Sequence, residues 1–169
     1  MYLALISDTH VGADQVTTLV NSLRERLTKA DRILHAGDVV VPELLRALAE
    51  IAPVDAVAGN MDGEEITNGW PERGVFRFEG HRVGLIHGWG SPHDLSRRVW
   101  ERFTGDDNQP EVDVIVFGHS HQPLIEERRG VLMVNPGSPT DRRWAPHRTM
   151  GWLELLPDKP PKASIIRIE

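Results

Sequence analysis

The sequence YLALISDTH, at residues 2–10, decides how this chain is interpreted. The apolar run Tyr2–Ile6 is typical of a buried strand, and Ser7 and Gly12 mark its end. Asp8 and His10 follow two residues apart, so in extended backbone their side chains point to the same side. A carboxylate and an imidazole in this arrangement can bind one metal ion, although D-x-H alone is frequent by chance.

The residues after this stretch alternate between helix and strand patterns. Residues 15–29 and 42–50 carry apolar side chains at the spacing of one helix face, and Pro42 stands where a helix tolerates proline. Apolar runs at 32–36 and 54–58 predict two more buried strands. This alternation implies parallel pairing, and polar residues follow each strand at the edge where open α/β sheets bind ligands.

The second half of the chain is richer in short strand patterns, and a single helix is predicted at residues 94–103. The strand patterns cover residues 75–78, 82–86, 112–117, 124–127, 131–134, 152–156 and 164–168. Glu79-Gly80 and Arg129-Gly130 fall between neighbouring strands and predict turns. We therefore expect an α/β fold in one domain, residues 1–169, whose second sheet is mixed or antiparallel and packs on the first.

Composition excludes several classes of function. The 169 residues include no cysteine, which rules out thiolate catalysis and cysteine-ligated metal sites and is compatible with a reducing cytoplasm. The net charge of −6 gives no basic field for unspecific nucleic-acid binding. No signal-peptide pattern and no long apolar run is visible, so we expect a cytoplasmic protein without a membrane span.

Seven potential metal ligands follow the predicted strands, and all offer oxygen or nitrogen: Asp8, His10, Asp38, Asn60, His87, His119 and His121. Glycines adjoin most of them, which permits tight turns where side chains must converge. Mixed carboxylate, amide and imidazole donors suit Mn²⁺, Fe²⁺, Co²⁺, Ni²⁺ or Zn²⁺ better than Ca²⁺. Two such ions about 3.5–4 Å apart could hold a hydroxide and hydrolyse a phosphate ester by in-line attack.

Five motifs carry a family resemblance: Asp8-Thr9-His10, Gly37-Asp38, Gly59-Asn60, His87-Gly88 and Gly118-His119-Ser120-His121. Their order and spacing resemble those of the calcineurin-like metallophosphoesterases over most of the chain. With the Asn135-Pro136-Gly137-Ser138 loop, the chain is most similar to the small bacterial and archaeal phosphodiesterases of that superfamily. Their eukaryotic relatives include vacuolar protein sorting 29, a subunit of retromer.

This resemblance implies a four-layer α/β/β/α sandwich of two mixed sheets flanked by helices, and a binuclear site. It implies that Asp8, His10 and His121 bind one divalent ion, that Asn60, His87 and His119 bind the other, and that Asp38 bridges both. Manganese is the ion expected first, with nickel, cobalt, iron and zinc as alternatives. Asp38, Asn60 and His119 are the residues expected to be catalytic.

Met61 departs from the wider superfamily, where a histidine commonly follows the asparagine and helps to protonate the leaving oxygen. Methionine cannot donate a proton, so a general-acid contribution on the order of 10²–10⁴-fold is lost unless another group supplies it. Asp62, His93 or a neighbouring arginine could do so. The small phosphodiesterases that the chain resembles often lack this histidine too, so the site need not be inactive.

Other polar and aromatic residues have two interpretations. His35 fits a hydrogen-bonded core residue better than a ligand, and His93 fits a loop residue without a role. Trp89 and Trp144 could stack a base or an aromatic leaving group. Five arginines could form a rim that attracts phosphate, or simply face water: Arg97, Arg98, Arg142, Arg143 and Arg148.

Three functions therefore stay open. The first is a metal-dependent phosphodiesterase acting on a small phosphate ester, with nucleotides included. The second is a metal-stabilised scaffold without catalysis, like the retromer relative. The third is a phosphomonoesterase or nucleotidase, against which the absence of an acid at Met61 argues. The sequence names neither the natural substrate nor whether the chain forms a homo-oligomer.

Overall fold

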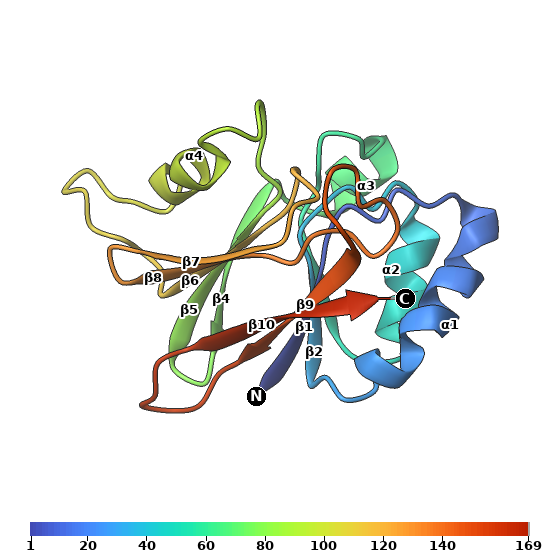
Figure 1. Cartoon of the computed structure of the whole chain (residues 1–169), viewed down its shortest axis with the longest axis horizontal. Helices are drawn as coiled ribbons and strands as arrows, with labels where there is room; N and C mark the ends of the chain where they lie inside the picture. The colour runs from blue at the N-terminus through green and yellow to red at the C-terminus, as the bar shows by residue number, and fades with distance from the viewer. Residues whose placement is uncertain (169) are drawn as a thin grey trace.

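Two sheets packed face to face form the centre of the molecule (Figure 1). The computed structural model describes residues 1–168, and within them each sheet has five strands. The first sheet has the order β10 (Lys162–Ile168), β9 (Arg148–Glu154), β1 (Tyr2–Ile6), β2 (Arg32–His35), β3 (Val54–Ala56). The second has the order β4 (Arg73–Phe78), β5 (His81–Ile86), β6 (Val114–Phe117), β8 (Val131–Asn135), β7 (Leu124–Arg128).

Both sheets are mixed, as predicted. β1 pairs in parallel with β2 and antiparallel with β9, while β5, β6 and β8 pair in parallel. The predicted turns are hairpin ends between β4 and β5 and between β7 and β8, with positive φ at Glu79, Gly80, Arg129 and Gly130. Because parallel strands end at the same edge, the segments after β1, β2, β5 and β6 can meet there.

Helices cover the outer face of each sheet and complete four layers (Figure 1). The short 3₁₀ helix η1 (Ala13–Gln15) leads into α1 (Val16–Leu27), which packs with α2 (Pro42–Ala49) on the first sheet. α4 (Leu95–Glu101) packs on the second sheet. α3 (Glu64–Gly69) follows β3 and buries Ile66 in the first layer of core. The sandwich implied by the sequence is confirmed.

β1 shows how the sequence produces these layers. Leu3 and Leu5 point into the core between the sheets, whereas Ala4 and Ile6 point into the core beneath α1 and α2. A strand covered on both faces needs apolar residues at every position, which is why the buried residues 3–6 are all apolar. Polar residues begin only at Ser7, where the strand leaves the two cores.

The predicted boundaries differ from the observed ones in two informative places. β9 begins at Arg148, four residues before the predicted strand. The sequence did not predict this start, because Thr149, Met150 and Gly151 are all buried and do not show the alternation of polar and apolar residues that indicates a strand. α3 was not predicted, since six residues offer less than two helical turns of periodicity. Within residues 1–168, every helix is too short or too polar to cross a membrane.

Candidate metal centre

All seven predicted ligands lie together at one edge of the sandwich. The first sheet contributes four of them, Asp8 and His10 after β1, Asp38 after β2 and Asn60 after β3, and the second contributes His87 after β5 and His119 and His121 after β6. Asp8, Asp38, His87 and His121 are buried, His10 and His119 are partly buried, and Asn60 is exposed. The cluster is therefore closed toward the core and open on the side of Asn60.

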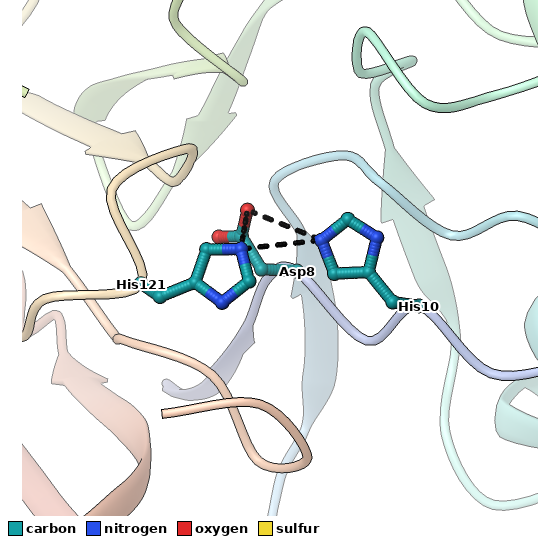
Figure 2. Close-up of side chains that lie close together, drawn as sticks. All are labelled: Asp8, His10 and His121. Atoms are coloured by element: carbon teal, nitrogen blue, oxygen red, sulfur yellow. Dashed lines mark hydrogen bonds and ion pairs between the residues drawn. The ribbon is translucent and has the colours of Figure 1, made fainter. Parts of the chain in front are cut away.

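Asp8, His10 and His121 form the first group that could hold a metal ion. The two imidazole rings face each other beside the Asp8 carboxylate, His10 on the loop after β1 and His121 on the turn after β6 (Figure 2). Asp8 Oδ1 lies 3.3 Å from His121 Nε2 and 4.0 Å from His10 Nε2. The two Nε2 atoms are 3.2 Å apart.

Asp8, Asp38 and His87 form the second group. His87 Nε2 lies 3.2 Å from Asp38 Oδ2 and 3.9 Å from Asp8 Oδ1. Asp38 Oδ2 is also 3.4 Å from His10 Nε2, so this carboxylate lies between the groups. Because Asp8 belongs to both groups, two carboxylates lie between the candidate ion positions, whereas the resemblance implied Asp38 alone.

Asn60 and His119 extend the second group toward the open side. Asn60 Oδ1 lies 3.2 Å from His87 Nε2 and 2.9 Å from His119 Nδ1. The backbone N–H of His119 donates to both carboxylate oxygens of Asp8, at 3.1 and 3.0 Å. The turn after β6 is thus fixed directly on the carboxylate that both groups share.

Backbone carbonyl groups determine which nitrogen of three imidazole rings faces the cluster. Nδ1 of His87 donates to Ala36 O at 2.8 Å, and Nδ1 of His121 donates to Asp141 O at 2.5 Å. Nε2 of His119 donates to Gly90 O at 2.7 Å. A carbonyl oxygen only accepts, so Nε2 of His121 and Nδ1 of His119 present lone pairs to the cluster when these rings are neutral. Burial lowers the pKa of His87, but its hydrogen bond to Asp38 raises that pKa overall, so in the metal-free protein Nε2 of His87 donates to Asp38 and must lose its proton before it can bind a metal.

Facing lone pairs and carboxylates repel one another unless a cation lies among them. His121 Nε2 is of this kind, because Nδ1 of the same ring donates to Asp141 O and the Nε2 lone pair faces Asp8 Oδ1 at 3.3 Å. The donor set is oxygen and imidazole nitrogen, as divalent transition metals prefer. The residues therefore fit two divalent ions.

Burial sets the protonation states that metal binding needs. Burial lowers the pKa of His10, His119 and His121, which keeps these rings neutral. Burial raises the pKa of Asp8 to about 6 in the metal-free protein. The pKa of Asp38 falls to about 2 in spite of burial, because His87 donates a hydrogen bond to it and carries positive charge nearby.

Several residues that support the cluster were not predicted from the sequence. The Asp62 carboxylate accepts backbone N–H donors from Asp38 at 3.1 Å, Val40 at 2.6 Å and Gly59 at 2.7 Å, so it ties the loops after β2 and β3 together. It is engaged as an acceptor and does not face the cluster as a spare acid. The sequence feature that could have indicated this role is the position of Asp62 in a turn between Gly59 and Gly63, where aspartate often accepts hydrogen bonds from nearby backbone.

The loop after β8 supports the cluster from the other side. Asn135 Nδ2 donates to Gly118 O at 2.8 Å and to Ser120 Oγ at 3.1 Å, which holds the turn that carries His119. Ser138 Oγ donates to Asp8 O and Thr140 Oγ1 donates to Thr9 O, both at 2.7 Å. The Asn135–Ser138 motif contributed to the resemblance, but its hydrogen bonds required the structure.

The remaining candidates divide clearly. His35 is buried and contacts Thr9 Oγ1 through Nε2 at 3.1 Å, which confirms the interpretation as a core residue. The His93 side chain is 88% exposed and lies 3.5 Å from Asp94, so it points to solvent rather than to the cluster. Trp144 is 89% exposed, while Trp89 lies beside the cluster and is 42% exposed.

The arginines do not act as one rim. Arg97 pairs with Glu101, and Arg142 donates to Ala145 O. Arg98 donates to the carbonyl groups of the loop between β5 and α4. Arg143 lies near enough for its charge to lower the pKa of His10, His119 and His121, after the larger effect of burial.

Comparison with known proteins assigns a family to this geometry. Residues 1–157 match the model of the calcineurin-like phosphoesterase superfamily domain. The chain is 38% identical over 143 residues to a probable metallophosphoesterase of Methanothermobacter thermautotrophicus, a match that covers 83% of this chain and 78% of the relative.

Two solved structures show the same fold at lower identity. Wild-type Vps29 from Entamoeba histolytica, complexed with Zn²⁺, has a TM-score of 0.67 at 22% identity, and the match covers 100% of both chains. A protein described as a novel archaeal phosphodiesterase has a TM-score of 0.68 at 20% identity, covering 98% of this chain and 100% of that one. Together with the matched family model and the archaeal relative, the cluster of aspartates and histidines identifies this chain as a member of the calcineurin-like phosphoesterase superfamily.

Proposed function

We propose that this protein is a binuclear, metal-dependent phosphodiesterase. The observation that carries the proposal is the convergence of imidazole nitrogens from both sheets on the neighbouring carboxylates of Asp8 and Asp38, at a site open to solvent on one side. Asp8, His10 and His121 would hold one ion, Asn60, His87 and His119 the other, and Asp38 would lie between them with Asp8. When bound, two divalent ions supply a nucleophile at neutral pH and neutralise charge that develops on the phosphoryl group.

The residues of the chain have separate tasks in this proposal. The Ala36, Gly90 and Asp141 carbonyl groups orient three imidazole rings through their outer nitrogens. Asn60, on the open side, would contact the phosphoryl group through its amide nitrogen, and His119 would act on it through the ion that it holds. Preorganised ligands of this kind do not need to rearrange as charge develops, which is the usual source of electrostatic catalysis.

Two features favour a diester over a monoester. The N–H of Met61 donates to Asp38 Oδ1 at 2.8 Å, so residue 61 adjoins the cluster, yet its side chain cannot protonate a leaving oxygen. A cavity also lies on each side of the cluster, one of about 330 Å³ that includes Asn60 and His87 and one of about 590 Å³ that includes His10. A diester has two substituents to place, whereas a monoester has one.

The test is turnover by chelator-stripped protein supplied with one metal at a time. We expect Mn²⁺, Ni²⁺, Co²⁺ or Zn²⁺ to restore hydrolysis of bis(p-nitrophenyl) phosphate more than that of p-nitrophenyl phosphate. Asp38→Ala and His119→Ala should abolish this turnover with circular dichroism unchanged, whereas Asp106→Ala, at an exposed loop carboxylate, should not. Metal binding without turnover of either ester would favour a scaffold, and a monoester preference would favour a phosphatase.

A further inference from the structure

The smaller of the two cavities is lined partly by charged and aromatic residues that are not candidate metal ligands. It holds about 330 Å³ and opens off the cluster at Asn60 and His87. Its lining also includes Trp89, Glu72, Arg73 and Arg102. These side chains come from the β5–α4 loop, the start of β4 and the end of α4, so three separate segments build the cavity.

The two arginines form a positive end of the cavity. The Arg102 guanidinium lies 5.8 Å from the centre of the Trp89 ring, and Arg73 donates to the carbonyl oxygen of Arg102. Arg73 also lies 5.1 Å from the ring centre of Phe103, a buried residue that fixes its position. Across residues 1–168, no carboxylate lies within ion-pairing distance of either guanidinium, so both charges are available to a ligand.

The loop that carries Trp89 is held in place. Arg98 donates to Trp89 O at 2.9 Å, to His93 O at 2.7 Å and to Ser91 O. Gly90 O, the next carbonyl group of the same loop, accepts from His119 Nε2 at 2.7 Å. The backbone that carries Trp89 is therefore held beside the metal cluster, which lowers the entropy cost of ordering this loop when a ligand binds.

We infer that this cavity binds one substituent of the substrate, and that this substituent is a nucleoside carrying a second anionic group. The inference rests on the proposed function, because the scissile phosphate would lie at the metal cluster. Trp89 would stack on the base, Arg73 and Arg102 would bind the second phosphate, and Glu72 would accept a hydrogen bond from a sugar hydroxyl or a base amino group. The volume is at the lower end of small-molecule sites and fits one nucleoside rather than a longer chain.

The kinetic test compares two substrates with the same leaving group on the Mn²⁺-loaded protein. Thymidine 5′-(p-nitrophenyl phosphate) carries a nucleoside, whereas methyl p-nitrophenyl phosphate carries none. Trp89→Leu should lower kcat/KM for the nucleoside ester on the order of tenfold and leave the methyl ester unchanged. Trp144→Leu, at an exposed tryptophan outside the cavity, is the matched control and should change neither.

The binding test separates the cavity from catalysis. Calorimetry with Mn²⁺-loaded protein should show tighter binding of thymidine 3′,5′-bisphosphate than of thymidine 5′-monophosphate. Arg102→Gln and Arg73→Gln should remove most of that difference, while Arg77→Gln, an exposed arginine on the same strand as Arg73, should retain it.

The outcomes distinguish the two proposals. If neither diester is hydrolysed with any metal but the bisphosphate binds through Arg73 and Arg102, the cavity assignment stands and the phosphodiesterase does not. If both diesters are hydrolysed and Trp89→Leu affects them equally, or if the second phosphate adds no affinity, the cavity assignment is overturned while the proposed function stands.

Discussion

Replacing Gly59 by alanine should disrupt the metal centre without removing any ligand. A Cβ at this position would lie 2.2 Å from Asp38 Oδ1 and 2.4 Å from Asp38 N. The nearest atoms include backbone, so the clash cannot be relieved by rotating one flexible side chain. To reach a normal contact, the Asp38 carboxylate must move by about 1 Å, which would break its 2.8 Å hydrogen bond from Met61 N and shift Oδ2 away from His87.

The expected size of the effect follows from that displacement. Overpacking of this kind costs about 1–3 kcal/mol, or roughly 3–10 °C in Tm for a chain of this length. Loss of ligand position should weaken Mn²⁺ binding by about 10–100-fold, as for other changes that misorient ligands. Both quantities can be measured on one preparation, by thermal unfolding with excess chelator and by calorimetric titration with Mn²⁺.

Gly69→Ala is the matched control. Gly69 is the last residue of α3, and a Cβ added there would have, among the described residues, no atom within 4 Å apart from its chain neighbours and the backbone of its own helix. This variant should bind Mn²⁺ like the unmodified protein. Equal Mn²⁺ affinity in the Gly59→Ala and Gly69→Ala variants would refute the argument, because the close approach of residue 59 to Asp38 would then have no consequence for the ligands.

Three further predictions concern neighbouring positions. Met61→His should raise turnover of p-nitrophenyl phosphate more than that of bis(p-nitrophenyl) phosphate, and an unchanged ratio would count against the missing acid as the cause of diester preference. Asp62→Asn should lower the free energy of unfolding, measured in urea titrations, by about 3 kcal/mol, because an amide cannot accept hydrogen bonds from all three backbone N–H groups. The control is Asp158→Asn, at an exposed turn, and an equal loss of stability in the two variants would contradict this prediction. Burial lowers the pKa of His35 from 6.5 to about 3, so the contribution of the neutral ring to stability is complete above pH 6.5 and is lost as the pH falls toward 3. Between about pH 7.5 and about pH 5, the free energy of unfolding of the metal-free protein should fall by about 2 kcal/mol more than that of the His35→Gln variant. Parallel pH profiles of the two proteins would disprove this.

The layers, and the edge at which the candidate ligands meet, could be predicted because both leave local patterns. β1 and β2 are covered on both faces and appear as continuous apolar runs, and the polar residues that follow them mark the edge where the ligands meet. Five short motifs in a fixed order named the seven candidate ligands, and the structure brings these seven residues together. The alternation of helices and strands in the first half gave the parallel pairing of β1, β2 and β3.

The supporting interactions could not be predicted, because they connect residues far apart in the sequence. Ser138 holds a carbonyl group 130 residues away, and nothing near Ser138 indicates that partner. The glycines were predicted to permit tight turns, and the positive φ of Gly37 and Gly88 agrees with that. Gly118 serves a different purpose, since a Cβ there would lie 1.8 Å from Ser7 Oγ and 2.7 Å from Asp8 Oδ2, so it provides space.

The backbone at the ligands explains why so many hydrogen bonds converge on these loops. Five of the seven candidate ligands have φ between 45° and 71°: Asp8, His10, Asp38, His119 and His121. A non-glycine residue in this left-handed region costs roughly 1–2 kcal/mol, so the group costs roughly 5–10 kcal/mol, which is comparable to the whole stability of a typical domain. Such a conformation persists only where surrounding contacts impose it. Here those contacts are the Asp62 carboxylate, the Ser138 and Thr140 hydroxyl groups and the Asn135 amide, all of which bind the strained loops rather than the ligand side chains. The packing of the sandwich therefore offsets the conformational cost of the candidate ligands. The hydrogen bonds of these four polar side chains hold the strained loops against the packed strands.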